Sequence, residues 1–136
     1  MKTKISDKEL FLAADAARAD SYSPYSSVSV GAALLCASGK LYTGANIENS
    51  AYSPSVCAER VAFFKAINAG ERDFLSIAVA GGKVGEPPIA EFPPCGVCRQ
   101  IMAEFCRGDF RIIFGEDKTL RFAELLPYGF DEEYLK

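Results

Sequence analysis

The sequence contains no histidine among its 136 residues, and this absence excludes several mechanisms. Catalytic systems that pair serine or cysteine with histidine need an imidazole ring, so the chain cannot use them. If the protein is an enzyme, its proton carrier is an Asp, Glu, Lys, Tyr or Cys side chain. If it holds a metal ion, the ligand atoms are sulfur or oxygen.

Long apolar segments are also absent, because the longest run, over residues 30–37, falls far short of the roughly 20 residues that a membrane span needs. At the N-terminus, Lys2 and Lys4 are followed by Asp7 and Glu9 before any apolar stretch, which is not the pattern of a signal peptide. We therefore expect a cytoplasmic protein with reduced thiols. The five cysteines agree with this, because an odd number cannot all pair in disulfides.

The chain has little excess charge of either sign. The 15 basic and 18 acidic side chains give a net charge of -3, which argues against a nucleic-acid partner and favours a small neutral ligand. The length and the 49% of hydrophobic residues suit one globular domain, and no repeat or long linker divides the sequence. We expect a single domain over residues 1–136.

Hydrophobic spacing and turn residues predict elements in the order α-β-β-α-β-α-β-β. The predicted helices cover residues 6–20, 56–70 and 95–107, with a helical turn at 123–126. The predicted strands cover residues 28–36, 75–80, 110–114 and 119–122, and a further strand after the first one ends at residue 43. Loops are predicted at 46–55 and 81–94. This order favours an α/β fold in which helices cover both faces of a mixed sheet.

A C-x-x-C pair, Cys95 and Cys98, lies where a proline-rich loop gives way to a predicted helix. Residues three apart lie on one face of a helix, so both sulfur atoms can point to one place. The pair fits a zinc site, a redox dithiol or two buried structural thiols. Cys57 stands at the start of another predicted helix and can supply a third sulfur ligand.

Three sulfur ligands are typical of a catalytic zinc site, which leaves the fourth position to water, whereas a structural site has four protein ligands. Cys106 lies eight residues beyond Cys98 on the same predicted helix, about 12 Å along its axis, so it is too far away to join. Cys36 fits an apolar position of a predicted strand. The sequence therefore favours an open site.

Three thiolates around Zn²⁺ leave one negative charge uncompensated, which opposes the ionisation of a water molecule on the metal. The positive ends of two helices can offset part of this charge. Arg60 and Arg99, each directly after a key residue, can donate hydrogen bonds to the sulfurs. Glu59, two residues after Cys57, is a further candidate functional residue.

Several motifs run through the chain in a fixed order. They are Tyr22-Ser23-Pro24-Tyr25 before Val30-Gly31-Ala32-Ala33, Asn46-Ile47-Glu48-Asn49 with Tyr52, Cys57-Ala58-Glu59-Arg60, Pro94-Cys95-Gly96-Val97-Cys98-Arg99-Gln100, and Leu125-Leu126-Pro127 before Phe130. The two cysteine motifs resemble those of the zinc nucleoside deaminases. The others narrow the resemblance to the small, homotetrameric cytidine deaminases, and the match covers essentially the whole chain.

This resemblance implies a three-layer α-β-α fold with a five-stranded mixed sheet, and one Zn²⁺ per chain held by Cys57, Cys95 and Cys98. It implies a hydrolase of pyrimidine salvage that converts cytidine and 2′-deoxycytidine to uridine and 2′-deoxyuridine with release of ammonia. The zinc-bound hydroxide would attack C4 of the base. Glu59 would carry one proton to N3 and a second proton to the leaving amino group.

The resemblance also implies the nucleoside contacts. Asn46 and Glu48 match residues that hold the 3′-hydroxyl of the ribose, and Ala58 matches a further substrate contact. Tyr52 and Phe130 match positions that reach the site of a neighbouring subunit. A homotetramer whose sites are completed by neighbouring subunits is therefore implied, with a nucleoside as the small-molecule substrate and neither nucleic acid nor a membrane as partner.

Two positions depart from the pattern of these deaminases: Val28 stands where Phe is common, and Ser50 where a small apolar residue is usual. The loss of a ring beside the base opens space or weakens stacking by about 1 kcal/mol.

Two other functions fit the cysteines: deamination of a modified or antibiotic cytosine nucleoside such as blasticidin S, and a zinc-stabilised binding module without turnover. Asn46 and Glu48 disfavour the antibiotic deaminases, which lack this motif, whereas a fourth protein ligand would support the binding module.

Overall fold

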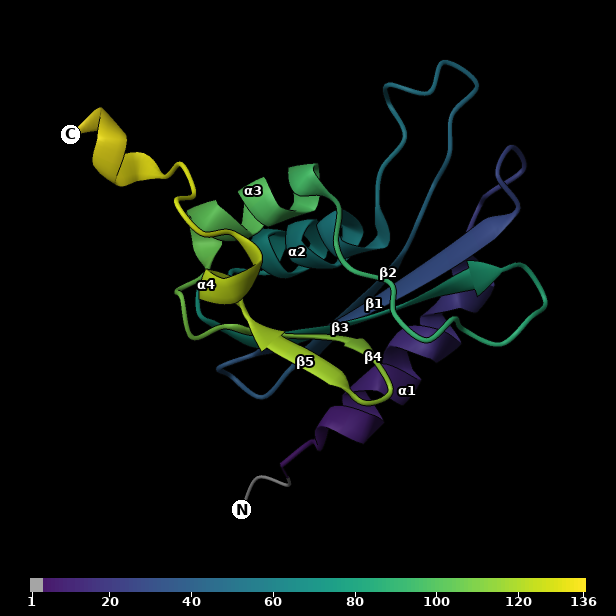
Figure 1. The fold of residues 1–136 in the computed structure, drawn as a ribbon, viewed down its shortest axis with the longest axis horizontal. Coiled ribbons are helices and arrows are strands. Elements are labelled where there is room, and N and C mark those ends of the chain that lie inside the picture. The colour runs from purple at the N-terminus through teal and green to yellow at the C-terminus, as the bar shows by residue number, and fades with distance from the viewer. Residues whose placement is uncertain (1–3) are drawn as a thin grey trace.

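The computed structural model describes residues 4–136, and its elements follow the predicted order (Figure 1). The helices are α1 (Asp7–Ala17), α2 (Ala58–Asn68), α3 (Gly96–Phe105) and α4 (Phe122–Leu125), with 3-10 helices at Arg18–Asp20 and Glu132–Leu135. The strands are β1 (Val28–Cys36), β2 (Leu41–Ala45), β3 (Phe74–Lys83), β4 (Arg111–Gly115) and β5 (Lys118–Arg121). From residue 4 onward, no helix combines the length and the apolar character needed to cross a membrane. Residues 1–3, on which part of the signal-peptide prediction rests, lie outside the described residues.

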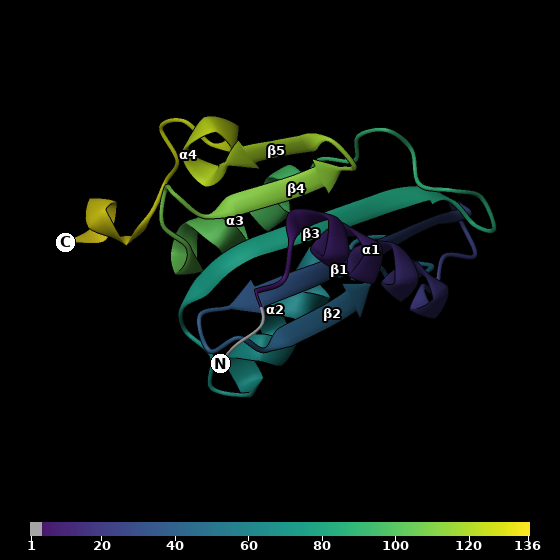
Figure 2. The ribbon, with the colours of Figure 1, turned by 90° about the horizontal axis from the view of Figure 1, so that it is seen from below.

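The strands form one mixed sheet in the order β2-β1-β3-β4-β5. Neighbouring strands run antiparallel except β3 and β4, which are parallel and are connected through α3. Figure 2 shows α1 on one face of the sheet and α2 and α3 on the opposite face. The predicted arrangement of three layers with five strands is therefore confirmed.

Helix α1 begins where its sequence predicts. The Ser6 hydroxyl accepts a hydrogen bond from the N–H of Glu9, and the Glu9 carboxylate accepts one from the N–H of Ser6, which completes a capping box. A Cβ at Gly31 of β1 would lie 2.0 Å from the carbonyl oxygen of Ala14, so the absence of a side chain there lets α1 lie directly on the sheet. This contact leaves the opposite face of β1 to the other helices.

The larger apolar core lies between the sheet and the layer of α2 and α3. Phe63 of α2, Met102 of α3 and Ile112 of β4 are fully buried in it. The ring of Phe63 makes edge contact with Phe74 at a centroid distance of 5.2 Å. Because α2 and α3 both rest on this core, the sheet fixes the positions of their N-terminal ends.

Strand β3 is longer than predicted, because it runs to Lys83 and leaves only residues 84–95 as the loop before α3. The two glycines at 81 and 82 indicated a loop, but both pair with β1. A Cβ at Gly81 would lie 2.5 Å from the ring of Phe92, so the missing side chain makes room for the loop that follows. The strand and the loop that covers it therefore pack directly on each other.

Smaller differences concern the ends of other elements. Helix α2 begins at Ala58 instead of residue 56, because Val56 pairs with Ile47 in an isolated β-bridge. The last predicted turn of α1 is the 3-10 helix Arg18–Asp20, and β2 continues to Ala45. These shifts leave Cys57 as the N-cap residue of α2.

Candidate metal centre and active site

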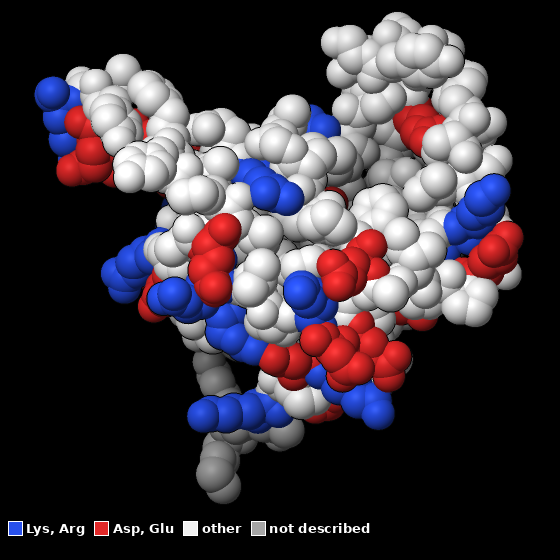
Figure 3. Space-filling view, in the orientation of Figure 1, with Lys and Arg blue, Asp and Glu red and all other residues white. Residues whose placement is uncertain are grey.

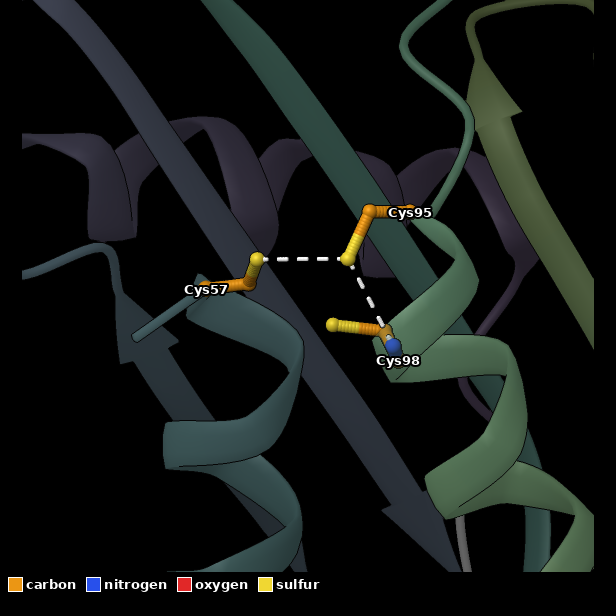
Figure 4. Close-up of side chains that lie close together, drawn as sticks. All are labelled: Cys57, Cys95 and Cys98. Carbon is orange, nitrogen blue, oxygen red and sulfur yellow. Dashed lines mark hydrogen bonds between the residues drawn. The ribbon is translucent and has the colours of Figure 1, made fainter. Parts of the chain in front are cut away.

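The three cysteines predicted to share a metal ion lie together where α2 and α3 begin (Figure 4). Their sulfur atoms all lie within 4.8 Å of one another, and the Sγ atoms of Cys57 and Cys95 are 3.5 Å apart. Sulfur ligands at about 2.3 Å from a tetrahedral Zn²⁺ are about 3.8 Å apart, so the cluster fits one zinc ion. Within residues 4–136, no further cysteine and no acidic residue joins the three cysteines as a fourth ligand. The donor set is that of an open site.

Helix geometry explains why the sulfur atoms converge. Cys57 and Cys95 are the N-cap residues of α2 and α3, and Cys98 lies in the first turn of α3. The Sγ of Cys95 accepts a hydrogen bond from the N–H of Cys98 over 3.5 Å. Because the first N–H groups of a helix carry partial positive charge, both helices favour thiolates at these positions.

Arg60 adds a full positive charge beside the cluster, and its Nη2 donates to the Sγ of Cys57 over 3.4 Å. The hydrogen bond from Cys98 and the contact with Arg60 lower the pKa of the Cys57 thiol to about 5. The pKa of the Cys98 thiol is raised, first by its hydrogen bond to Cys57 and also by burial. Cys57 is therefore the thiol of this pair that ionises more readily, and a bound cation would favour the second thiolate.

Arg99 makes contacts other than the predicted hydrogen bonds to sulfur. Its Nε donates to the carbonyl of Pro94 over 2.9 Å, and its Nη1 donates to the carbonyl of Leu125 over 2.8 Å. Arg99 therefore positions the residue before Cys95 and ties it to the end of α4. The sequence did not indicate these two carbonyl partners, because the carbonyl of Leu125 reaches α3 only through the path of the C-terminal segment.

Cys36 and Cys106 lie outside the cluster. Cys36 is buried at the end of β1, and Cys106 is half-buried after the end of α3. Burial raises the pKa of the Cys36 thiol to about 11 and raises that of Cys106 as well. Both thiols are therefore protonated near neutral pH and fill apolar positions.

A cavity of about 380 Å³ lies beside the cluster, which is a common size for a small-molecule site. It is lined by Cys57, Cys95, Glu59 and Arg60, by the predicted substrate contacts Asn46, Glu48 and Ala58, and by Ser26, Val28, Val30, Ser55, Val56, Phe92 and Pro93. Most residues of the last group were not predicted to be functional. Phe92 and Pro93 could have been suggested by their closeness in sequence to Cys95. Ser26 could have been suggested by its position two residues before Val28.

Glu59 is the buried acid of this cavity. Its side chain is only 3% exposed, and it occupies the second position of α2, directly after the turn that carries Cys57. Burial raises the pKa of the Glu59 carboxyl to about 7, and the negative charge of Cys57 adds to this effect. A carboxyl group with such a pKa can accept and release a proton near neutral pH, as a proton carrier must.

Asn46 is held on three sides. Its Oδ1 accepts hydrogen bonds from the Ser21 hydroxyl (2.6 Å) and the N–H of Val30 (2.8 Å), and its Nδ2 donates to the carbonyl of Val28 (2.9 Å). An amide group has two N–H donors, so one further hydrogen bond can be donated to a ligand.

Glu48 is held by the turn before β1. Its Oε1 accepts hydrogen bonds from the N–H groups of Tyr25 (3.0 Å) and Ser26 (3.1 Å), and its Oε2 accepts one from the Ser26 hydroxyl. These bonds, that of the Ser26 hydroxyl first, hold the pKa of the Glu48 carboxyl below its usual value. Ser27 in the same turn has a φ of 60°, in the left-handed region that few serines adopt. Glu48 is thus a fixed, charged acceptor.

Tyr52 and Phe130 do not line this cavity within the chain. Tyr52 is 72% exposed in the loop between β2 and α2, where its ring meets Tyr25 edge to face at 6.1 Å. Phe130 is 54% exposed in the C-terminal segment and stacks on Tyr134 at 5.5 Å. The carbonyl of Phe130 accepts a hydrogen bond from Gln100, which ties the segment to α3.

The rim of the cavity carries little charge. The loop between β2 and α2 projects from the molecule, and Figure 3 shows it as almost free of charged side chains. Glu48 is the only charged residue between positions 41 and 58. Such a rim suits a neutral polar ligand better than a polyanion.

Three thiol ligands with an open fourth position, beside a buried carboxyl group in a cavity, define a metal-dependent hydrolytic enzyme. The family model described as "Cytidine and deoxycytidylate deaminase zinc-binding region" matches residues 4–116. The chain therefore belongs to the cytidine and deoxycytidylate deaminase family, and the matched region includes all three cysteines and Glu59.

Individual relatives agree with this assignment. The chain is 47% identical over 123 residues to the cytidine deaminase of Sporosarcina psychrophila, which covers 88% of this chain and 87% of that protein. It is 45% identical over 121 residues to the cytidine deaminase of Halalkalibacterium halodurans, with 86% and 88% covered. The crystal structure of the Burkholderia pseudomallei cytidine deaminase has a TM-score of 0.80 at 38% identity and covers 89% of this chain and 96% of that chain. The Mycobacterium tuberculosis enzyme has a TM-score of 0.82 at 31% identity, with 93% and 98% covered.

Proposed function

We propose that this protein catalyses the hydrolytic deamination of cytidine and 2′-deoxycytidine to uridine and 2′-deoxyuridine, with release of ammonia. The observation that carries the proposal is the position of Glu59, a buried carboxyl group in the same cavity as the three-cysteine cluster. Membership of the family and the names of the relatives support the same reaction.

Cys57, Cys95 and Cys98 would hold the zinc ion, which when bound lowers the pKa of a water molecule and so supplies a nucleophile near neutral pH. The remaining proton transfers belong to Glu59. Its carboxylate accepts a proton from the water that attacks C4 of the base and delivers that proton to N3. It then passes the second proton of the water to the amino group, which leaves as ammonia. A carboxyl pKa of about 7 suits both directions of transfer.

Asn46 and Glu48 are proposed to hold the 3′-hydroxyl of the sugar. Asn46 retains one N–H donor, and Glu48 is a carboxylate acceptor in the same cavity. A hydroxyl group donates one hydrogen bond and accepts others, so it complements such a pair. Ala58, the first residue of α2, lines the cavity without a polar side chain and is proposed to contact the substrate through its backbone.

We further propose a homotetramer in which Tyr52 and Phe130 complete the sites of neighbouring subunits. Their exposed rings on two projecting segments support a role in contacts between chains. Light scattering tests this, because a tetramer has four times the 14.7 kDa mass of the chain, and a monomer at working concentration would contradict it. A single domain over residues 1–136, a cytoplasmic location and a role in pyrimidine salvage are proposed with it.

The decisive experiment is a cytidine turnover assay, read by the absorbance change on conversion to uridine, with the zinc content measured on the same sample. We expect turnover with one zinc ion per chain. One zinc ion per chain without turnover of cytidine would contradict the proposal. Assays with modified and antibiotic cytosine nucleosides would then distinguish the alternative deaminase from a binding module.

A further inference from the structure

Phe92 lines the cavity beside the cysteine cluster. Among the described residues that line the cavity, Phe92 is the only aromatic one, and the other apolar walls include Val28, Val30 and Val56. Phe92 lies in the loop between β3 and α3, three residues before Cys95, and also packs against the larger core. Phe92 therefore belongs both to the cavity lining and to the packing of the core.

Strand β3 fixes the place of this ring. A Cβ at Gly81 would lie 2.5 Å from Cδ2, 2.6 Å from Cγ and 2.7 Å from Cε2 of Phe92, so the ring rests on the backbone of Gly81. The N–H of Phe92 donates to the carbonyl of Phe114 over 2.8 Å, and the N–H of Ile89 donates to the carbonyl of Gly81 over 2.8 Å. The ring thus rests on β3, and the loop that carries it is hydrogen-bonded to β3 and β4.

A pyrimidine base is flat and uncharged, and an aromatic ring is the side chain that binds such a surface best. Measured by alanine substitution, contact of a base with an aromatic side chain changes affinity by about 5- to 150-fold. The position where related deaminases commonly have Phe holds Val28 in this chain, and Val28 also lines the cavity. Within one chain, no other described ring lines this cavity, and the rings of Tyr52 and Phe130 proposed to reach it belong to neighbouring subunits.

We propose that Phe92 is a specificity-determining residue that binds the pyrimidine base, and that Gly81 is its positioning residue. The inference rests on the proposed function, since it names the residue that recognises the base of the substrate. Because the contact is the same before and during the reaction, Phe92 affects binding more than the chemical step.

The first test is Phe92→Leu, which keeps an apolar side chain and removes the ring. We expect KM for cytidine and the dissociation constant for uridine, measured by calorimetry, to rise about ten-fold, while kcat stays within about two-fold. Phe92→Tyr keeps the ring and should restore affinity. Phe105→Leu is the matched control, because Phe105 is also a half-buried phenylalanine but lines a different cavity at the other end of α3.

The second test addresses Gly81. The methyl group of Gly81→Ala must displace the Phe92 ring, so this variant should weaken nucleoside binding as Phe92→Leu does. The double variant should be no weaker than either single variant, because both remove the same contact. Independent, additive losses would overturn the positioning role of Gly81.

Zinc content and the thermal midpoint are measured for every variant. Unchanged affinity in Phe92→Leu would overturn the proposal, and so would a loss of affinity that follows a loss of zinc, because Phe92 would then only support the cysteine loop. Uridine binding is read without turnover. A wild-type protein that binds uridine but does not deaminate cytidine would contradict the proposed function, while the Phe92 variants would still decide this inference.

Discussion

Gly44 of β2 is a position where one added methyl group should disturb the active site directly. A Cβ there would lie 2.5 Å from the carbonyl oxygen of Ala58 and 2.7 Å from the N–H nitrogen of Ala62, both in α2. Ordinary contact for a Cβ begins at 3.4 Å, so Gly44→Ala must move the first turn of α2 by about 0.9 Å. That turn follows Cys57 and carries Glu59.

A displacement of about 1 Å of reacting groups can lower a rate by about 100-fold, and overfilling a packed contact costs about 1–3 kcal/mol of stability. We therefore expect Gly44→Ala to lose about 100-fold in kcat/KM for cytidine. Zinc affinity, measured by competition with a chromogenic chelator, should fall as well. Urea unfolding of the zinc-loaded protein should show a loss of about 1–3 kcal/mol.

Gly96→Ala provides the matched control, because Gly96 begins α3 as Ala58 begins α2. A Cβ at Gly96 meets nothing within 4 Å, so this variant should keep wild-type turnover and gain a few tenths of a kcal/mol to about 1 kcal/mol in helix stability. Wild-type turnover and zinc affinity in Gly44→Ala would refute the reasoning. Equal losses in both variants would refute it too, because close packing at Gly44 would not be the cause.

Three other substitutions test separate parts of the site. Glu59→Gln removes the proton carrier and leaves the sulfur ligands, so turnover should fall about 100- to 10,000-fold while zinc content and thermal midpoint stay unchanged; retained turnover would contradict the assigned role. Cys98→Ala should lose zinc, measured by elemental analysis, and unfold at a lower temperature; a stable variant with a full zinc content would rule out Cys98 as a ligand. Ser26→Ala removes the hydroxyl that holds the Glu48 carboxylate, so KM for cytidine should rise while kcat and zinc content change little; an unchanged KM would show that this hydrogen bond does not serve binding of the sugar.

Elements defined by local interactions were predictable from the sequence. The capping box of Ser6 and Glu9 indicated the start of α1, because both of its hydrogen bonds join residues three apart. The C-x-x-C spacing indicated that Cys95 and Cys98 share a site, because one helical turn relates them. Cys57 was added from its place at the start of another helix, and the structure confirms that the three sulfurs meet.

Features that depend on contacts between distant segments were not predictable in this way. Gly81 indicated a loop, yet it continues β3 because Phe92, eleven residues later, covers the space of its missing side chain. The sequence placed Arg99 next to Cys98 but did not indicate its hydrogen bond to the carbonyl of Leu125, 26 residues away. In both cases the deciding partner comes from a segment whose path is set by packing on the sheet.

The closeness of Cys57 and Cys95 in the fold also determines the effective concentration at which their thiols are presented to a metal ion. These residues lie 38 positions apart, and closing such a loop in an unfolded chain costs on the order of 3 kcal/mol. The folded sheet has already closed it, so the third ligand is presented to a metal ion on the order of 200-fold more effectively than by the unfolded chain. Zinc binding and folding are linked reciprocally, so a bound zinc ion favours the folded state over the unfolded state by the same factor. A cell that limits zinc would therefore reduce both the activity and the abundance of this protein.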